Sequence, residues 1–427
     1  MSDGTRSEPS PAPLPPYRSH LEELRAVLQD QGSLGLLLID TSAHAQIEHQ
    51  YGSAAFENVM RTAHELVLGR RGNEVRRDDI FCVRDRGGDA FLVFFSPSRE
   101  PGLLRIAALR RAAEQVEAHL NRKLVRIASP YLGTLRRISV GFALAFYNPL
   151  VMPERAVSRL IEDAWSCVHV LRAQRQLQNR CDLQEVLLSD KLTTVFQPIL
   201  SLRGRSVVGY EALSRGPAGS VYHMPLRLFA LAAEADLVFE LDRKCRRQAF
   251  LAASSLPPGC RMFLNVLPSA LYDPEFRGQA LVRALASQGL RPERVVLEIT
   301  ENSAIENYDV FREAISELTH LGFTLAVDDV GAGYSGLEKI ARLEPRYLKF
   351  DRELVRNIDS SYIRREMTRA LKAFADRIGS TIIAEGIESE RELSTLLELG
   401  IDYGQGFLLG RPAAGFEPLL AAGSETA

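Results

Sequence analysis

The sequence predicts an α/β protein in two parts: an α+β half, followed by a C-terminal TIM-like (β/α)₈ barrel. Two observations predict the barrel. After residue 190, eight short apolar runs alternate with helical patterns, an alternation typical of a (β/α)₈ fold. Nearly every one of these runs also ends in an acid, an amide or a base. Before residue 190, strands and helices are mixed without that regular alternation.

The composition describes an ordinary globular protein. The 427 residues are 46% hydrophobic and 25% charged, enough for two or three domains. The net charge of -2 provides no positive field for a nucleic acid polymer or a membrane surface. The five cysteines are widely spread and form no CxxC pair, which favours a reducing compartment and therefore the cytoplasm. No apolar run reaches the roughly 18–20 residues of a membrane span, so no membrane segment is expected.

The first half is expected to begin with a disordered leader at 1–16, which is rich in Pro and Ser. Residues 17–30 should form a helix, because Leu21, Leu24 and Leu28 recur at helical spacing. Two short apolar runs around a Gly-Gly turn predict a hairpin. The strands of this half are expected at 34–40, 80–83, 91–95 and 138–146, with further helices ending near 69 and at 102–120 and 153–190.

The apolar runs of the second half are rich in Val, Ile, Leu and Phe, and several are apolar on both faces. Buried parallel strands have this character. A doubly wound open sheet is the alternative that the pattern leaves open. The eight strands are expected at 195–200, 206–213, 262–266, 294–300, 324–330, 347–350, 381–385 and 403–408.

Polar side chains mark these strands, mostly at the strand ends. In a barrel such positions converge on the C-terminal rim, where active sites are built. Neighbouring buried carboxylates would repel one another unless a cation lies between them. A single acid at a strand end often caps the next helix. Helix capping is an improbable explanation for polar residues on all eight strands. The residues are Gln197, Glu211 with Arg215, Asn265, Glu298 with Thr300 and Glu301, Asp328 with Asp329, Lys349 with Asp351, Glu385 with Glu388, and Gln405.

The ligand types point to a hard cation. Five of these residues offer only oxygen and none is Cys or His, which favours Mg²⁺ or Mn²⁺ over zinc. The adjacent pair Asp328 and Asp329 could serve two ions, the usual arrangement for in-line attack on phosphorus. Lys349 could orient the attacking water or offset phosphate charge. The five oxygen donors are Glu211, Asn265, Glu298, Asp328 and Asp329.

An ordered set of motifs resembles the EAL domain family. The run Gln197-Pro198-Ile199 and then Glu211-Ala212-Leu213 look like the opening of such a domain. The later motifs follow in the family's order across the second half of the chain. They begin at Leu264-Asn265-Val266, Leu297-Glu298-Ile299-Thr300-Glu301, Asp328-Asp329-Val330-Gly331, Leu348-Lys349-Phe350-Asp351, Ala384-Glu385-Gly386-Ile387-Glu388 and Gln405-Gly406-Phe407.

The resemblance implies a phosphodiesterase that opens c-di-GMP to linear pGpG with two Mg²⁺ or Mn²⁺ ions. It also implies a homodimer formed through this domain. Its metal ligands would be Glu211, Asn265, Glu298 and Asp328, with Asp329 on the second ion. The resemblance assigns Lys349 and Glu385, with Glu211, to catalysis, and Glu301 to anchoring the loop 330–335. It assigns Gln197, Arg215, Glu388 and Gln405 to holding the substrate or the shape of the site.

Two departures from the family pattern keep every ligand. Val330 and Ala332 stand where Phe and Thr are usual, and Leu267 precedes Pro268 where Ser is common. The first change bears on the mobility of the loop at 330–335, and hence on rate and regulation.

The first half resembles a degenerate GGDEF domain, which has the diguanylate cyclase fold. The segments that carry the resemblance are Leu36–Asp40, Tyr51-Gly52, the turn Arg86–Phe91, Ser139–Ala143 and the helix around Glu162–Ala164. Ala90 stands where that family has a metal-binding Glu, and Glu48 stands where it has a guanine-binding Asn. Because a cyclase needs a metal-held triphosphate, no cyclase activity is expected; Asp40 alone is as compatible with a structural role.

The residues Arg76 to Asp79 have the RxxD form of that family's inhibitory site, but lie seven residues before the Gly-Gly turn, where five is typical. The ligand that the resemblance implies for this half is GTP or c-di-GMP. The expected organisation is a leader at 1–16, a GGDEF-like domain at 17–176, a linker helix at 177–190 and an EAL domain at 191–427. The alternatives to a phosphodiesterase are a non-catalytic c-di-GMP receptor and a scaffold whose surface binds a partner.

Overall fold

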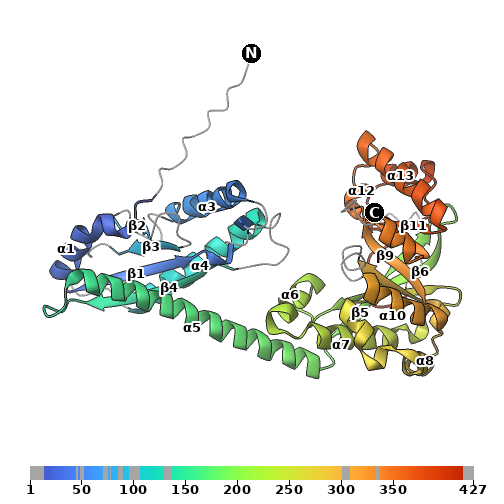
Figure 1. Ribbon diagram of the computed structural model, residues 1–427, viewed down its shortest axis with the longest axis horizontal. Coiled ribbons are helices and arrows are strands. Elements are labelled where there is room, and N and C mark those ends of the chain that lie inside the picture. Colours follow the sequence, from blue (N-terminus) through green and yellow to red (C-terminus); the bar gives the residue numbers. More distant parts are fainter. Residues whose placement is uncertain are drawn as a thin grey trace, which may run out of the picture. The chain divides into compact units, whose positions relative to one another are not determined.

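The computed structural model describes residues 14–44, 47–48, 52–70, 76, 78–84, 90–95, 106–128, 137–300, 308–331 and 337–416. The chain divides into two compact units, Met1–Asn179 and Arg180–Ala427, drawn in Figure 1. The expected leader lies outside the described residues up to position 13. Each unit is built around its own hydrophobic core.

The N-terminal unit contains a four-stranded antiparallel sheet in the order β2-β3-β1-β4. Its strands are β1 (Ser33–Asp40), β2 (Ile80–Val83), β3 (Ala90–Phe94) and β4 (Ser139–Phe146). All four lie within one residue of their expected bounds, because each is a short apolar run between polar segments. The turn at 85–89, which carries Gly87-Gly88-Asp89, is outside the described residues.

Helices cover both faces of this sheet. Along β1, Leu36 and Leu38 pack with residues of α1 and α5, whereas Leu37 and Ile39 pack with residues of α3 and α4. This division follows from the two-residue period of a strand. The unit is therefore an α+β layered fold, as expected. Its helical elements are η1 (Tyr17–His20), α1 (Leu21–Gln31), η2 (Ser42–His44), α3 (Ser53–Leu68), α4 (Ile106–Ala128) and α5 (Pro153–Leu188).

Helix α5 is continuous across the expected boundary. The linker helix foreseen at 177–190 is the last part of this single helix, and the division into units falls at Asn179 and Arg180. Within the second unit, Leu183 and Val186 pack against Leu228 and Leu241.

The second unit is a closed eight-stranded barrel in the order β10-β11-β12-β5-β6-β7-β8-β9, which excludes the doubly wound open sheet. Its strands are β5 (Thr193–Ser201), β6 (Ser206–Arg215), β7 (Arg261–Asn265), β8 (Val295–Thr300), β9 (Thr324–Val330), β10 (Tyr347–Phe350), β11 (Thr381–Ala384) and β12 (Tyr403–Gly404).

One strand runs against the others. β5 pairs antiparallel with both β6 and β12, so the expectation of eight parallel strands is wrong for β5, although Gln197 still lies opposite Glu211. The short connection between Ser201 and Ser206 explains the reversal, because parallel strands need a long crossover whereas a tight turn joins antiparallel ones.

The last strand is shorter than expected. β12 contains only Tyr403 and Gly404, whereas the apolar run predicted a strand through residue 408. Leu409 and Gly410 donate backbone hydrogen bonds to Gly406, so the chain turns there. A Cβ atom on Gly406 would lie 2.2 Å from the Ile387 backbone, which explains why glycine occupies this close approach.

The helices of the barrel unit bury the main core against the outside of the strands. Arg246 on α7 is 4% exposed and pairs with Asp242 and Asp273, which ties this helix to the segment after β7. The helical elements are α6 (Pro225–Ala235), α7 (Val238–Ala252), η3 (Ala253–Ser255), η4 (Pro268–Tyr272), η5 (Pro274–Phe276), α8 (Gly278–Ala286), η6 (Pro292–Arg294), α10 (Tyr308–His320), α11 (Leu337–Arg342), α12 (Arg352–Val355), α13 (Tyr362–Ile378) and α14 (Glu390–Glu398).

Inside the barrel, one layer of apolar side chains closes the end opposite the polar residues. Strand β6 contributes Gly209 to this layer. A Cβ atom on Gly209 would lie 2.7 Å from the ring of Phe263, so the ring occupies the space that a side chain at 209 would need. Inward side chains packed in layers are typical of such barrels. The others are Ile199, Phe263, Val296, Ala326, Tyr347 and Ile383, with Tyr403 packed against them.

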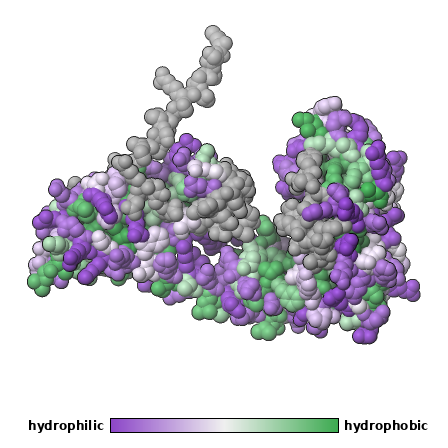
Figure 2. Space-filling model, viewed as in Figure 1, coloured by the Kyte–Doolittle hydropathy of each residue, from purple (hydrophilic) through white to green (hydrophobic). Residues whose placement is uncertain are grey.

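The visible surface is mixed in character. Figure 2 shows hydrophilic side chains over much of it, with hydrophobic residues in small groups. Scattered exposed apolar residues are normal for globular proteins. Among the described residues, no helix has both the length and the apolar character needed to cross a membrane.

Candidate functional site

A polar layer lies directly above the apolar layer of the barrel. On seven strands, the polar residue comes two positions after the inward-facing residue of the apolar layer, which is Gly209 on β6. Residues two positions apart on a strand lie on the same face, so the polar residues also face the barrel interior. On the reversed strand β5 the polar residue precedes Ile199 by two positions. The eight residues of this layer are Gln197, Glu211, Asn265, Glu298, Asp328, Lys349, Glu385 and Gln405.

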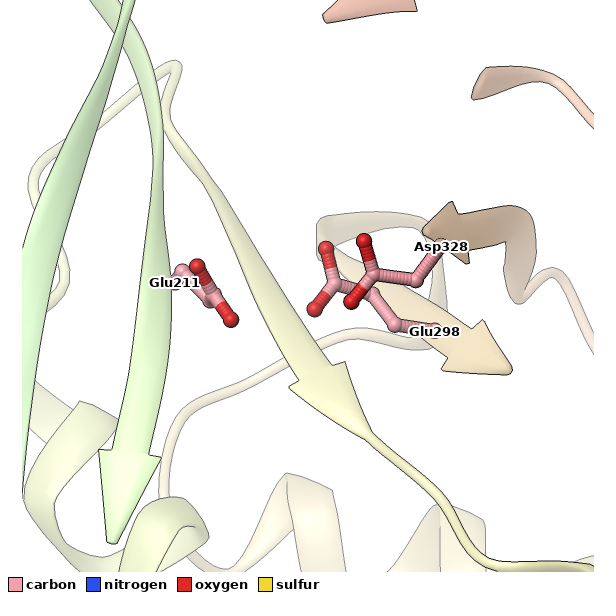
Figure 3. A group of neighbouring side chains, drawn as sticks. All are labelled: Glu211, Glu298 and Asp328. Atoms are coloured by element: carbon pink, nitrogen blue, oxygen red, sulfur yellow. The ribbon is translucent and has the colours of Figure 1, made fainter. Parts of the chain in front are cut away.

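Three carboxylates of this layer converge from separate strands. Glu211 on β6, Glu298 on β8 and Asp328 on β9 are all buried, and each places one oxygen within 4.8 Å of the others. Figure 3 shows the Glu211 carboxylate facing those of Glu298 and Asp328. A second such group joins Asp328 with Asp329 and Glu385. Because Asp328 belongs to both groups, the donor atoms have the arrangement of two adjoining cation sites.

Lys349 lies at the centre of the layer. Its side chain is 1% exposed, and its Nζ atom is 2.6 Å from Glu385 Oε1 and 3.0 Å from Glu298 Oε1. Asp328 Oδ1 and Glu211 Oε1 follow at 3.3 and 3.6 Å. One ammonium therefore faces four carboxylates, so the fully ionised cluster carries an excess of three negative charges.

This excess shifts the ionisation of its members. Burial and the neighbouring carboxylates raise the pKa of Glu298 well above its ordinary value, although Lys349 opposes the shift. Burial also raises the pKa of Glu385 to about 8, again against the effect of Lys349. Although burial opposes it, the surrounding carboxylates hold the pKa of Lys349 well above its usual range. Carboxylates that repel one another in this way favour a bound cation.

A β-bulge explains how two consecutive aspartates face the same site. In the pairing of β9 with β10, Val327 lies opposite Leu348 and Val330 opposite Phe350. Two residues of β9, Asp328 and Asp329, therefore lie opposite one residue of β10, Lys349. This is the arrangement that defines a β-bulge. Asp329 has a φ angle of 59°, a left-handed conformation that Asp tolerates better than most residues. Without the bulge, the two side chains would point to opposite faces.

The donor set fits a hard divalent cation. Glu298 Oε2 is buried and accepts no hydrogen bond from the described part of the chain. Asn265 Nδ2 donates to Glu211 Oε1 at 3.1 Å, which brings its amide to the edge of the carboxylate group. Burial and Asp328 raise the pKa of Asp329 to about 6. An all-oxygen set with unpaired buried acceptors is what Mg²⁺ and Mn²⁺ prefer.

The remaining expected site residues take different positions. Gln197 and Gln405 are buried beside Glu211 and bond to each other. Arg215 is half-buried at the end of β6, where its guanidinium donates to the Ser214 carbonyl. Glu388 is exposed. Glu301, the expected loop anchor, lies outside the described residues, as do 332–335 of the loop, although Val330 is buried in the core.

Glu392 supports the site and was missed by sequence reasoning. Its carboxylate is buried and accepts hydrogen bonds from the backbone N–H groups of Asn357, Glu388 and Ser389. It thereby joins the segment after β10 to the segment that carries Glu385. The Ser-x-x-Glu signature of a capping box was visible at Ser389, but its contact with Asn357 was not.

In the N-terminal unit, Asp40 is fully buried at the end of β1 and lies opposite Ala90. The guanidinium of Arg172 on α5 lies 2.7 Å from its Oδ2 atom, and the Ser42 N–H donates to Oδ1. Glu48 is exposed and accepts from the Ser53 hydroxyl. Asp79 is buried and accepts from the Arg76 N–H at 2.6 Å, so the RxxD sequence forms a local turn.

A family model described as the EAL domain matches residues 180–412, more than half of the chain. The chain belongs to the EAL domain family. EAL phosphodiesterases use divalent metal ions, and the acidic cluster of this EAL domain offers the corresponding donors.

Two curated relatives come from Pseudomonas aeruginosa. Cyclic di-GMP phosphodiesterase NbdA is 27% identical over 414 residues, which cover 93% of this chain and 50% of NbdA. The bifunctional diguanylate cyclase/cyclic di-GMP phosphodiesterase MucR is 26% identical over 430 residues, 94% of this chain and 58% of MucR. The chain spans about half the length of the curated relatives it matches.

A solved structure supports the same fold. The PaMucR phosphodiesterase in complex with c-di-GMP superimposes with a TM-score of 0.51 at 26% identity, over 55% of this chain and 97% of that one. The match extends over nearly all of that structure, so the EAL domain here is a complete barrel of the family type.

Proposed function

We propose that the EAL domain hydrolyses c-di-GMP to linear pGpG with the help of two divalent cations, Mg²⁺ or Mn²⁺. The observation that carries this proposal is the double carboxylate group, in which Asp328 belongs to two adjoining donor sets beside the buried Lys349. The names of NbdA and MucR support the substrate.

The ligand roles follow from these donor sets. Glu211, Asn265, Glu298 and Asp328 would hold one ion, and Asp329 would serve the second together with Asp328. When bound, the two cations would lower the pKa of a water molecule and offset the charge of the phosphate. Asn265 would contribute the only neutral donor of this group, through its amide oxygen.

Lys349 and Glu385 would hold the attacking water. Their ion pair measures 2.6 Å, and together they offer a donor and an acceptor at one point of the site. Lys349 can donate to the water oxygen or to a phosphate oxygen, while Glu385 accepts a proton from the water. Glu211 would orient this group as well as bind a cation.

Substrate contacts are assigned to the rim. Arg215 is half-buried at the end of β6, where its guanidinium suits a phosphate. Glu388 is exposed, and its carboxylate suits a donor group of a guanine base. Glu301 keeps its proposed role as the anchor of the loop at 330–335.

We also propose that the N-terminal unit is a degenerate GGDEF-like domain without cyclase activity. Arg172 neutralises Asp40, and Ala90 offers no carboxylate opposite it, so the described residues at this strand end leave no unpaired carboxylate for a metal-held triphosphate. The match to MucR covers 94% of the chain and thus includes this unit. GTP or c-di-GMP binding and a regulatory role remain proposals, and GTP should yield no cyclic product.

The same proposal includes the division into a GGDEF-like domain at 17–176, a linker helix at 177–190 and an EAL domain at 191–427. It also includes a homodimer formed through the EAL domain and a location in the cytoplasm. All five cysteines are free thiols, which agrees with a reducing compartment. Light scattering at several concentrations tests the dimer.

The rival function is a non-catalytic c-di-GMP receptor. Such receptors usually lack metal ligands or the lysine, whereas this chain retains Glu211, Asn265, Glu298, Asp328 and Lys349. A scaffold function would operate through the surface and does not require this buried cluster.

The test is to incubate the purified protein with c-di-GMP and either Mg²⁺ or Mn²⁺, and to separate the nucleotides by chromatography. We expect pGpG, and its absence with both metals would reject the enzyme. Glu211→Ala should abolish turnover because it removes a ligand, while Glu240→Ala, at an exposed position, should not. Calcium should inhibit, because it prefers more ligands at longer distances.

A further inference from the structure

Two buried amide side chains form a relay beside the metal ligand Glu211. Gln405 is 5% exposed and Gln197 is 7% exposed. Gln405 Nε2 donates to Glu211 Oε2 at 2.5 Å and to Gln197 Oε1 at 3.2 Å. Gln197 Nε2 donates in turn to the carbonyl oxygen of Gly410 at 3.1 Å.

The acceptors determine the orientation of both amides. Gln405 Nε2 faces a carboxylate oxygen and an amide oxygen, so its nitrogen and not its oxygen must lie there. A primary amide nitrogen has two hydrogens to donate, and both are used within the relay. The Gln405 nitrogen therefore has no hydrogen left for a nucleotide.

The relay holds one side of the Glu211 carboxylate, while other groups hold the second side. Glu211 Oε1 accepts from Asn265 Nδ2 at 3.1 Å and lies 3.6 Å from Lys349 Nζ. Contacts at both oxygens determine the rotation of the carboxylate plane. A ligand held in this way is preorganised for a cation.

The backbone fixes the relay at both ends. Gln197 lies opposite Glu211 in the antiparallel pairing of β5 with β6, and Gln405 donates its N–H to the Ala384 carbonyl. A Cβ atom on Gly410 would lie 2.4 Å from Pro198 Cγ, so the acceptor carbonyl comes from a close contact between segments. The relay is thus held by backbone pairing and close contacts among three parts of the chain.

We propose that Gln405, supported by Gln197, is a positioning residue for the metal ligand Glu211, and that its amide nitrogen makes no contact with the substrate. This proposal rests on the proposed function, because it takes Glu211 to be a metal ligand. Hydrogen-bond partners of metal ligands typically change metal affinity or activity by about 10–100-fold when removed.

The test compares Gln405→Leu and Gln197→Leu with the wild type. Gln279→Leu is the matched control, since Gln279 is exposed on α8 of the same unit. Mn²⁺ binding is titrated calorimetrically without nucleotide, and the KM for c-di-GMP is measured at saturating Mn²⁺. We expect Gln405→Leu to weaken Mn²⁺ binding roughly 10–100-fold, Gln197→Leu to weaken it less, and the KM to stay within about twofold.

Unchanged Mn²⁺ affinity together with a raised KM in Gln405→Leu would overturn the proposal and assign the residue to the substrate. If Gln405→Leu does not fold, Gln197→Leu carries the same comparison. Wild-type protein that binds Mn²⁺ but yields no pGpG would refute the proposed hydrolysis alone, because the Mn²⁺ titrations still compare the variants.

Discussion

Lys349 illustrates how one residue balances the site. Its ammonium lies within 4 Å of Glu211, Glu298, Asp328 and Glu385, so it offsets one charge of a cluster that also has to bind cations. A buried charge cluster of this kind contributes little to stability by itself. The importance of Lys349 therefore lies in the chemistry of the site, where its ammonium supplies a preorganised hydrogen-bond donor.

Replacing Lys349 by Met should separate metal binding from turnover. We expect the rate of pGpG formation to fall by at least about 100-fold, the typical effect of losing one preorganised donor. Mn²⁺ affinity should stay the same or increase, because a repelling positive charge has been removed. Calorimetric titration and nucleotide chromatography measure the two effects.

Lys339→Met, at an exposed position on α11, is the control and should change neither quantity. Loss of Mn²⁺ binding in Lys349→Met would contradict the prediction and would mean that the ammonium holds the carboxylates in place.

At the scale of elements, the C-terminal ends of the strands depend on the segments that follow them. Glu392 at the start of α14 joins two such segments through its bonds to Asn357, Glu388 and Ser389. Burial opposes its ionisation, but these backbone N–H groups outweigh burial and hold the pKa of Glu392 below its ordinary value. The ionised form is therefore a stabilising link.

This link predicts a pH-dependent stability. A carboxylate with a lowered folded pKa stabilises the protein above its unfolded pKa, and the effect disappears as pH falls through the folded pKa. Glu392→Gln should therefore reduce the free energy of unfolding by about 2 kcal/mol at pH 7. Urea unfolding should show this difference shrinking as the pH falls below about 4.

Glu398→Gln, at an exposed position near the end of the same helix, is the control and should behave like the wild type. A difference for Glu392→Gln that persists at low pH would indicate a packing effect instead of a charge effect.

At the scale of the whole molecule, the chain consists of two units with separate cores. The oxygen donors converge in the barrel, while the buried Asp40 of the N-terminal unit is paired with Arg172. Ligand binding stabilises only the unit that binds. The two units should therefore respond separately to cations and to substitutions.

Differential scanning calorimetry should resolve two transitions. Mn²⁺ at about 100 times its Kd should stabilise the barrel by about 2.7 kcal/mol and leave the N-terminal unit unchanged. Arg172→Met should lower only the melting temperature of the N-terminal unit, because it leaves the Asp40 carboxylate buried and unpaired.

A matched Arg175→Met variant would remove only a partly exposed pair with Glu117 and should have a smaller effect. A single transition shifted by both treatments would contradict the independence of the units.

Much of the fold could be predicted because local pattern and burial coincide. β9 and β10 match their predicted bounds, since strands buried on both faces appear as apolar runs ended by polar residues. The ligand chemistry was equally visible, because residue type alone distinguishes oxygen donors from the nitrogen and sulfur that zinc prefers.

By itself, then, the sequence determined the positions of most strands along the chain and the oxygen-rich set from Glu211 to Asp329, while the closure of the barrel came from the structure. Only the tertiary structure decided the reversal of β5, the bulge that turns Asp328 and Asp329 to one site, and the Arg172–Asp40 pair. It also decided that Gln405 donates to Glu211, a residue 194 positions away in the chain. The periodicity of apolar residues indicates which face of a segment is buried. These contacts instead depend on the pairing of segments that are distant in the sequence, which a local pattern does not indicate.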